Sequence, residues 1–276
     1  VLDFIFIRLW GWGIRGAAFA TVLSQALALC WQMKQLTNKD EILHLKRGIY
    51  RLKRHLVENI ISIGISPFLM NVCACIVVIF MNNQLVRYGG DMAVGAFGIA
   101  YSIAMIFVMF IIGLDQGMQP IAGYNYGSQQ NDRLMRVLKL TIFAATGIMV
   151  TAWLIAHLAP QYCARMFTTD PELIQQAIKA IKINMMMYPV VGFQMVVTNF
   201  FQCIGKVKIS IFLSLSRQLL FLIPLLVILP HFFNLNGVWT SLPSSDFLAS
   251  LVAAIIMVTY MRRLKQQSVN NQNLNS

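Results

Sequence analysis

Three ionisable residues lie inside long stretches of otherwise uncharged, apolar sequence. Asp115 directly follows 23 uncharged residues, Arg217 interrupts the apolar stretch 209–231, and Asp246 interrupts the apolar stretch 238–261. A charged side chain is costly in hydrocarbon, so a membrane-spanning segment retains one mainly for an ion pathway, a proton relay or a paired structural role. These residues are therefore the candidates for ion coupling.

The spacing of Arg217 and Asp246 predicts a contact between them. The connection between their two stretches, 231–237, is short, which makes the stretches antiparallel neighbours if both are helices. At 1.5 Å per residue, the two side chains differ in depth by only about 6 Å in a hydrocarbon core of about 30 Å. Two roles stay open: a structural ion pair, or a cation-sensitive carboxylate that its arginine releases during a transport cycle.

Amide-rich sequence surrounds Asp115. The run 113–127 (GLDQGMQPIAGYNYG) mixes glycine, proline and amides, among them Gln116 and Gln119. Such a composition is expected where a helix breaks against a water-filled cavity. The alternative is that Asp115 caps the end of a helix near the inner membrane face.

A second set of side chains could line a substrate cavity. Asn71, Gln194 and Asn199 are amides in apolar stretches, where a lipid-facing amide would cost several kcal/mol unless paired. Met185 begins a run of three methionines, which suit a promiscuous pocket for planar, apolar cations. Methionine clusters are also common on lipid-facing and core surfaces.

The elements that position these residues follow from composition. The 276 residues are 58% hydrophobic and 12% charged, with a mean hydropathy of +0.65. Soluble domains are about 45–50% apolar and about 25% charged, so a water-soluble fold is excluded, as are disorder, collagen and a secreted disulfide scaffold. The sequence predicts an all-α polytopic membrane protein.

Seven stretches are long and apolar enough to cross a membrane as helices, because a crossing needs about 20 residues. They are Gly16–Met33, Ile60–Met81, Met92–Leu114, Leu140–Pro160, Ile183–Ile204, Ile209–His231 and Val238–Met261. Cys73 and Cys75 have no histidine or second cysteine pair nearby, so we expect no metal site. G-x-S-x-G and H-E-x-x-H motifs do not occur and His157 has no sequence neighbour to act with, so we expect no enzyme.

Basic residues mark the orientation. Fifteen lysines and arginines lie on the side that holds segments 34–54, 133–139, 206–208 and 262–265, against four on the other side. The positive-inside rule puts the first side, and the C-terminus, in the cytoplasm. The net charge of +12 therefore describes topology in a cell (inner) membrane and does not indicate nucleic-acid binding.

Five segments resemble known transporter sequences. They are GWGIRGAAFATVLSQ (11–25), NNQLVRYGGDMAVGAFGI (82–99), GLDQGMQPIAGYNYGSQ (113–129), SRQLLFLIPLLVILP (216–230) and GVWTSLPSSD (237–246). In this order they resemble the multidrug and toxic compound extrusion (MATE) transporters, closest to the DinF/MepA-like branch.

The resemblance implies a fold and a function. Such transporters have twelve helices in two six-helix lobes and export cationic or amphipathic compounds in exchange for Na⁺ or H⁺, without a cofactor. Because residue 1 is Val and the span count is odd, we expect an N-terminally truncated chain that lacks most of the N-terminal lobe. The implied organisation is the end of that lobe (1–33), a cytoplasmic linker (34–59), the C-terminal lobe (60–263) and a polar tail (264–276).

The sequence also departs from the family pattern. Other branches carry a carboxylate in the seventh or tenth helix, but 60–81 and 183–204 contain none. The DinF-like branch is associated with an acid in the first helix, which this chain lacks. Three alternatives stay open: a flippase for lipid-linked oligosaccharides from the same superfamily, a non-transporting fragment, and an intramembrane enzyme. The flippase should show more cavity-facing cations than Arg217 alone.

Overall fold

A computed structural model describes Phe6 and residues 11–38 and 53–275 of the chain. The chain divides into two compact units, residues 1–61 and 62–276, which we describe separately. Most of the expected linker 34–59 and the expected remnant 1–10 lie outside the described residues. The predicted domain boundaries therefore stay predictions.

The first unit contains one complete apolar helix, α1 (Gly13–Thr37). Its start packs against Phe6, whose ring stacks on Trp12 at 5.8 Å between centroids and meets Phe19 edge-on at 5.4 Å. A Cβ added at Gly16 would lie 2.9 Å from the Phe6 carbonyl oxygen, so only a glycine allows this approach. The predicted first span is therefore confirmed as a helix of sufficient length and hydropathy.

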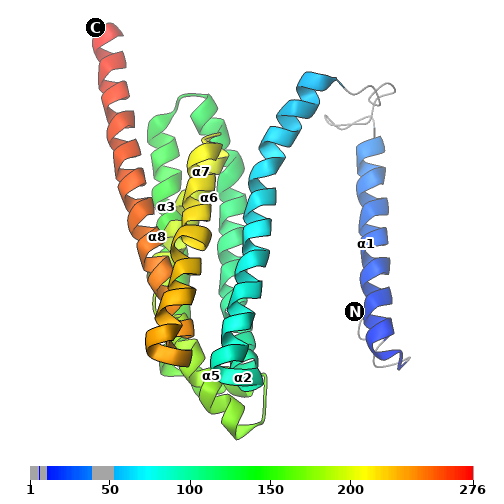
Figure 1. The fold of residues 1–276 in the computed structure, drawn as a ribbon. Helices are drawn as coiled ribbons and strands as arrows, with labels where there is room; N and C mark the ends of the chain where they lie inside the picture. The colour runs from blue at the N-terminus through cyan, green and yellow to red at the C-terminus, as the bar shows by residue number, and fades with distance from the viewer. Residues whose placement is uncertain (1–5, 7–10, 39–52, 276) are drawn as a thin grey trace. The chain divides into compact units, whose positions relative to one another are not determined.

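Helix α2 (Arg54–Gly127) supplies two predicted spans in one element. Its apolar part, Phe68–Gly127, has 60 residues and would extend about 90 Å if straight. Gly90 interrupts it with φ 65° and ψ −165°, a left-handed conformation that glycine adopts without a Cβ clash. Figure 1 shows the ribbon running down the bundle, turning and returning beside itself.

The next elements are α3 (Asn131–Leu158), the short α4 (Pro160–Arg165), α5 (Pro171–Asn184) and α6 (Tyr188–Cys203). Helix α5 begins as its sequence predicts. The Glu172 backbone N–H donates to the Asp170 side chain at 3.0 Å, with Pro171 in the first turn. We expected one long helix from here to Cys203, but α5 and α6 are bent by 54° at residues 185–187. Pro189 explains the break, because proline has no N–H for the Met185 carbonyl and its ring clashes with the preceding turn.

The last elements are α7 (Val207–Leu215), the π-helical segment η2 (Ser216–Leu222) and α8 (Ile223–Asn275). Before α7, Gly205 has φ 74°, and the N–H groups of Gly205 and Lys206 donate to the carbonyls of Gln202 and Phe201. This bonding pattern closes the end of α6 and reverses the chain. Within α8, Asn234 leaves the helical conformation with φ 51°, which divides α8 into two antiparallel parts.

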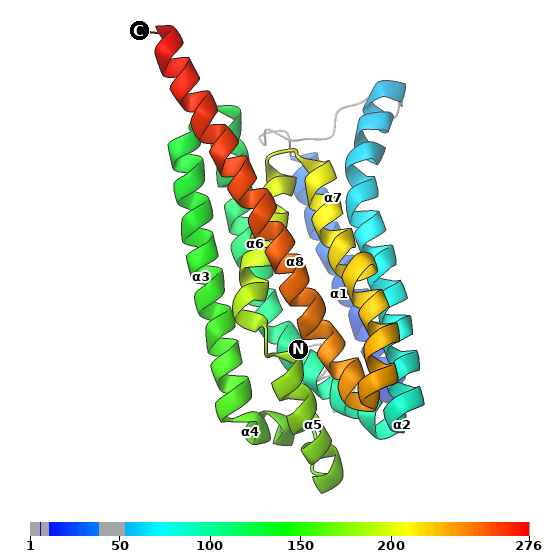
Figure 2. The same ribbon diagram turned by 60° about the vertical axis from the view of Figure 1, so that its left-hand side comes forward.

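The predicted all-helical membrane fold is confirmed. Counting α2 and α8 as two passes each and the bent pair α5–α6 as one, the described residues contain seven passes. In the second unit, the end of α2, the start of α3, the α6–α7 connection and the end of α8 lie at one end of the bundle (Figures 1 and 2). These are the segments that carry the basic clusters, as the alternation of charge predicts.

Helices α3 and α6 pack closely within the second unit. The buried face of α3 includes Ala145, Met149, Ala152 and Ala156, spaced three to four residues apart. A Cβ added at Gly192 of α6 would lie 3.0 Å from both the Ala145 carbonyl oxygen and the Met149 Cγ. Small residues allow this approach, which drives helix association in a membrane through van der Waals packing.

This packing predicts the effect of one added methyl group. We expect Gly192→Ala to destabilise the protein by about 1–3 kcal/mol, because the backbone oxygen of Ala145 cannot move away without displacing α3. The melting temperature of the purified protein in detergent measures the effect. Gly147→Ala is the matched control, since nothing lies within 4 Å of a Cβ there. Equal melting temperatures for the two variants would contradict the proposed packing constraint.

Candidate functional site

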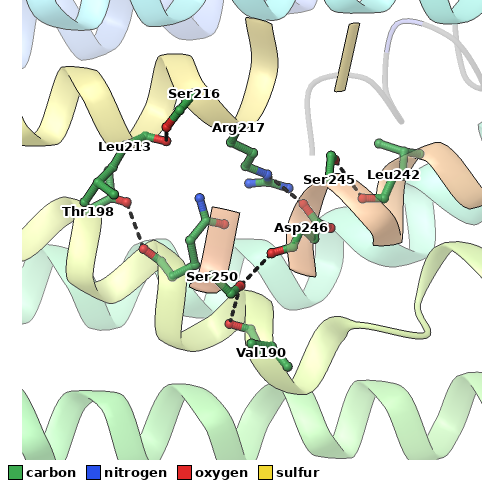
Figure 3. Close-up of polar contacts among 10 residues, drawn as sticks. Val190, Thr198, Leu213, Ser216, Arg217, Leu242, Ser245, Asp246 and Ser250 are labelled. Carbon is green, nitrogen blue, oxygen red and sulfur yellow. Dashed lines mark hydrogen bonds and ion pairs between the residues drawn. The ribbon is translucent and has the colours of Figure 1, made fainter. Parts of the chain in front are cut away.

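The expected contact between Arg217 and Asp246 is present. The Arg217 Nε donates a hydrogen bond to the Asp246 Oδ1 at 2.8 Å, across η2 and α8 (Figure 3). The Asp246 side chain is 5% exposed and the Arg217 side chain 31% exposed. Burial weakens water screening, so this pair is electrostatically stronger than a surface pair of the same geometry.

A local widening of the helix presents Arg217. The residue is the second of η2, where the backbone forms a π-helical turn in place of an α-helical one. Just before this turn, the Ser216 Oγ donates to the Phe212 and Leu213 carbonyls at 2.6 and 3.1 Å. Single π-helical turns within helices occur frequently at functional sites.

Ser250 connects the ion pair to α6. It lies one helical turn after Asp246, and its Oγ donates to the Asp246 backbone carbonyl at 2.7 Å and to the Val190 carbonyl at 3.4 Å. Val190 is in the first turn of α6, directly after the break at 185–187. The carboxylate on α8 is thus one residue contact away from the point where α6 is bent (Figure 3). We call Arg217, Asp246, Ser250 and Val190 the ion-pair seam.

The polar face of α6 continues the seam. Gln194 is 3% exposed, and its backbone carbonyl accepts from the Thr198 Oγ at 2.8 Å. Its side-chain Oε1 is buried without a hydrogen-bond partner among the described residues. Met185 is fully buried at the break. In this conformation both side chains belong to the interior of the second unit, and their role in lining a substrate cavity stays a prediction.

Asp115 of α2 forms a second polar position against α6. The residue is 3% exposed, its carboxyl interacts with the Asn199 side chain, and its Oδ1 has no hydrogen-bond partner in the described part of the chain. Asn199 follows Gln194 by five residues, so α6 contributes an amide to each polar position. A buried acceptor without a donor is an energetic cost that a bound cation or proton would relieve.

The expected break around Asp115 is wrong. Residues 113–127 are helical throughout, and α2 continues for three turns beyond Asp115. Without competing water, the backbone hydrogen bonds within the helix outweigh the low helix propensity of its glycines. Asp115 therefore lies inside the helix and does not cap its end.

The remaining predicted cavity residues lie apart from these positions. Asn71, Gln116 and Gln119 are exposed on the second unit. The structure thus brings together two groups, Arg217 with Asp246 and Asp115 with Asn199, and leaves three amides on the surface of the unit. Whether these surface amides face a substrate stays a prediction.

Sequence analysis missed Ser250 and the Val190 carbonyl. Ser250 follows Asp246 by four residues, so helix periodicity alone would have put both on one face. The π-helical turn and the Val190 contact depend on tertiary packing and have no comparable sequence signal.

The fold and site define an α-helical polytopic membrane protein with buried ionisable residues at a broken helix, a construction typical of secondary transporters. The MatE family model matches residues 63–228. The chain belongs to this family, the multidrug and toxic compound extrusion transporters, whose members are transporters and not enzymes.

Similar proteins agree with this assignment. A curated relative, "Multidrug export protein MepA" of Staphylococcus aureus (strain bovine RF122 / ET3-1), is 25% identical over 264 residues. The structure of the "MATE multidrug transporter DinF-BH", in complex with the dye rhodamine 6G, is 35% identical with a TM-score of 0.82, over 94% of this chain and 58% of that chain. A structure titled "Outward-facing conformation of a multidrug resistance MATE family transporter" is 25% identical with a TM-score of 0.85, over 96% of this chain and 60% of that chain. The chain covers 58% of the length of the MepA relative, with 96% of its own residues.

The ion-pair seam makes a prediction about stability. Asp246→Asn leaves the Arg217 guanidinium without its carboxylate, and we expect a loss of about 3 kcal/mol, the lower end for a broken buried pair because Arg217 is partly exposed. The double variant Arg217→Gln/Asp246→Asn removes both charges and should recover most of the loss. Melting temperatures in detergent measure both, with exposed Asp91→Asn as the control. Equal losses in the single and double variants would contradict the pairing.

Proposed function

We propose that this chain forms part of a multidrug exporter that moves amphipathic or cationic compounds out of the cell in exchange for an inward cation. In this proposal the Asp246 carboxylate is the coupling group and Arg217 is its internal counter-ion. Asp115 is a second candidate for the coupling group. The protein is placed in the cell inner membrane with its C-terminus in the cytoplasm, in line with the distribution of basic residues.

One observation carries the proposal: a buried Arg217–Asp246 pair lies beside a helix that is broken within the membrane-spanning bundle. Intramembrane ionisable residues are costly, and in transporters they commonly mark ion pathways. Broken helices supply the coordination and the hinge in many secondary transporters.

The geometry suggests how coupling would work. A proton or Na⁺ that neutralises Asp246 removes the attraction that holds Arg217 at 2.8 Å. The freed guanidinium would then move η2 relative to α8. Because Ser250 joins the same turn of α8 to Val190, this movement would reach the start of α6 and its 54° bend. Neutralisation and helix movement would thereby become one two-state event.

The proposed substrate class rests on similar proteins. DinF-BH, 35% identical over 94% of this chain, is described in complex with rhodamine 6G. We propose xenobiotics of that kind as substrates, a resident cofactor not being required, and either Na⁺ or H⁺ as the coupling ion. Since the chain covers 58% of the MepA relative, the remaining helices of a full transporter would complete the cavity.

Efflux from proteoliposomes tests the proposal. The full-length protein containing this chain is reconstituted, loaded with rhodamine 6G and given a Na⁺ or a pH gradient in separate experiments. We expect the double variant Arg217→Gln/Asp246→Asn to keep its fold and its dye binding but to lose gradient-driven efflux by about tenfold or more. The exposed Asp91→Asn variant should transport normally.

The double variant also separates the two roles of the pair. A purely structural pair would allow the folded, neutral double variant to transport at the normal rate, which would refute Asp246 as the coupling group. Asp115→Asn is measured in parallel, and loss of driven efflux in that variant alone would assign the coupling to Asp115. Absence of dye efflux from the unsubstituted protein under both gradients would favour the flippase function.

A further inference from the structure

A groove on the second unit lies far from the ion-pair seam. It has a volume of about 780 Å³ and lies between the first turns of α3 and the end of α8. Figure 2 shows α8 crossing α3 toward the end of the bundle where α3 begins. Arg262, which lines the groove, follows Asp246 by 16 residues, or about 24 Å along a helix.

The mouth of the groove is cationic. Arg136 and Lys139 of α3 and Arg262 of α8 line it, and all three are exposed. Asp132 is the one carboxylate among the lining residues, so positive charge predominates. This end of the bundle is the one that the basic clusters predict to face the cytoplasm.

The wall of the groove becomes apolar one turn further into the bundle. Leu140 and Phe143 of α3 are 69% and 84% exposed, and Val258 of α8 is 43% exposed. Arg136, Leu140 and Phe143 are spaced four and three residues apart, so they form one stripe along α3. On α8, Val258 and Arg262 are likewise four residues apart and share a face.

The order of charge and apolar surface matches one class of molecule. A phospholipid has a charged headgroup at the interface and acyl chains that extend into the hydrocarbon, as the groove changes from cationic to apolar. Lys139 lies about 12 Å from the start of α3, within reach of the interface for a long side chain that extends toward water. A cationic drug would be repelled by the three positive side chains, which makes the groove unsuitable as a substrate pathway.

We propose that this groove binds an anionic phospholipid of the inner leaflet. Its phosphate lies between Arg136, Lys139 and Arg262, and one acyl chain lies along Leu140, Phe143 and Val258. Charge complementarity selects the anionic headgroup, because basic side chains between helix ends attract anionic lipids. The apolar stripe selects a lipid over a free phosphate, which has nothing to bury there.

Native mass spectrometry of the full-length protein in mild detergent tests the site. Phosphatidylglycerol and phosphatidylcholine with identical acyl chains are compared as probes. We expect phosphatidylglycerol adducts on the unsubstituted protein, reduced by about tenfold or more in Arg136→Gln/Lys139→Gln/Arg262→Gln. The matched control removes the same charge from exposed positions outside the groove, as Arg87→Gln/Arg165→Gln/Lys208→Gln, and should bind normally.

Two further variants define which part of the groove acts. Arg136→Lys/Arg262→Lys keeps the charge and should retain the lipid, whereas Leu140→Gln/Phe143→Gln should release it with the cations intact. Equal binding of phosphatidylcholine, equal loss in the control triple variant, or displacement of the lipid by millimolar inorganic phosphate would overturn the proposal. A charge-dependent dimer in place of a lipid adduct would overturn it as well.

Discussion

Hydrocarbon offers a peptide group no water to bond with, so each backbone N–H and C=O within it must be satisfied by the protein itself. This constraint explains why residues 113–127 stay helical despite their glycines and why the chain reverses at Gly90, Gly205 and Asn234. It also explains why the break at 185–187 matters. A break within the bundle leaves polar backbone groups that nearby side chains must satisfy, and Ser250 does so at the Val190 carbonyl.

Helix α6 connects the parts of the structure that carry charge. It packs through Gly192 against α3, accepts Ser250 from α8 through Val190 and contributes Asn199 to Asp115 of α2. Its far end is held by aromatic contacts, where Tyr260 of α8 meets the Phe201 ring at 5.2 Å between centroids. A movement of α6 would therefore change the surroundings of both buried carboxylates at once.

Much of this could be predicted from the sequence. Apolar length gave the number of spans, basic residues gave their alternation, and the short connection 231–237 gave the Arg217–Asp246 contact, because each depends on local composition or on simple helix geometry. The cap at Asp170 was equally readable. The π-helical turn at Arg217, the extent of the break after Asn184 and the burial of Met185 depend on how distant segments pack. No local pattern encodes them.

The bend between α5 and α6 also changes the electrostatic character of the bundle interior. A continuous helix keeps its partial charges at its two ends, outside the hydrocarbon, but a broken one brings a negative C-terminus and a positive N-terminus face to face inside it. Asn184 ends the first half and Tyr188 begins the second, only a few residues from the Ser250 contact. These backbone dipoles do not depend on pH. The interior of the bundle thus stays a polar medium even when every side chain in the ion-pair seam is neutral.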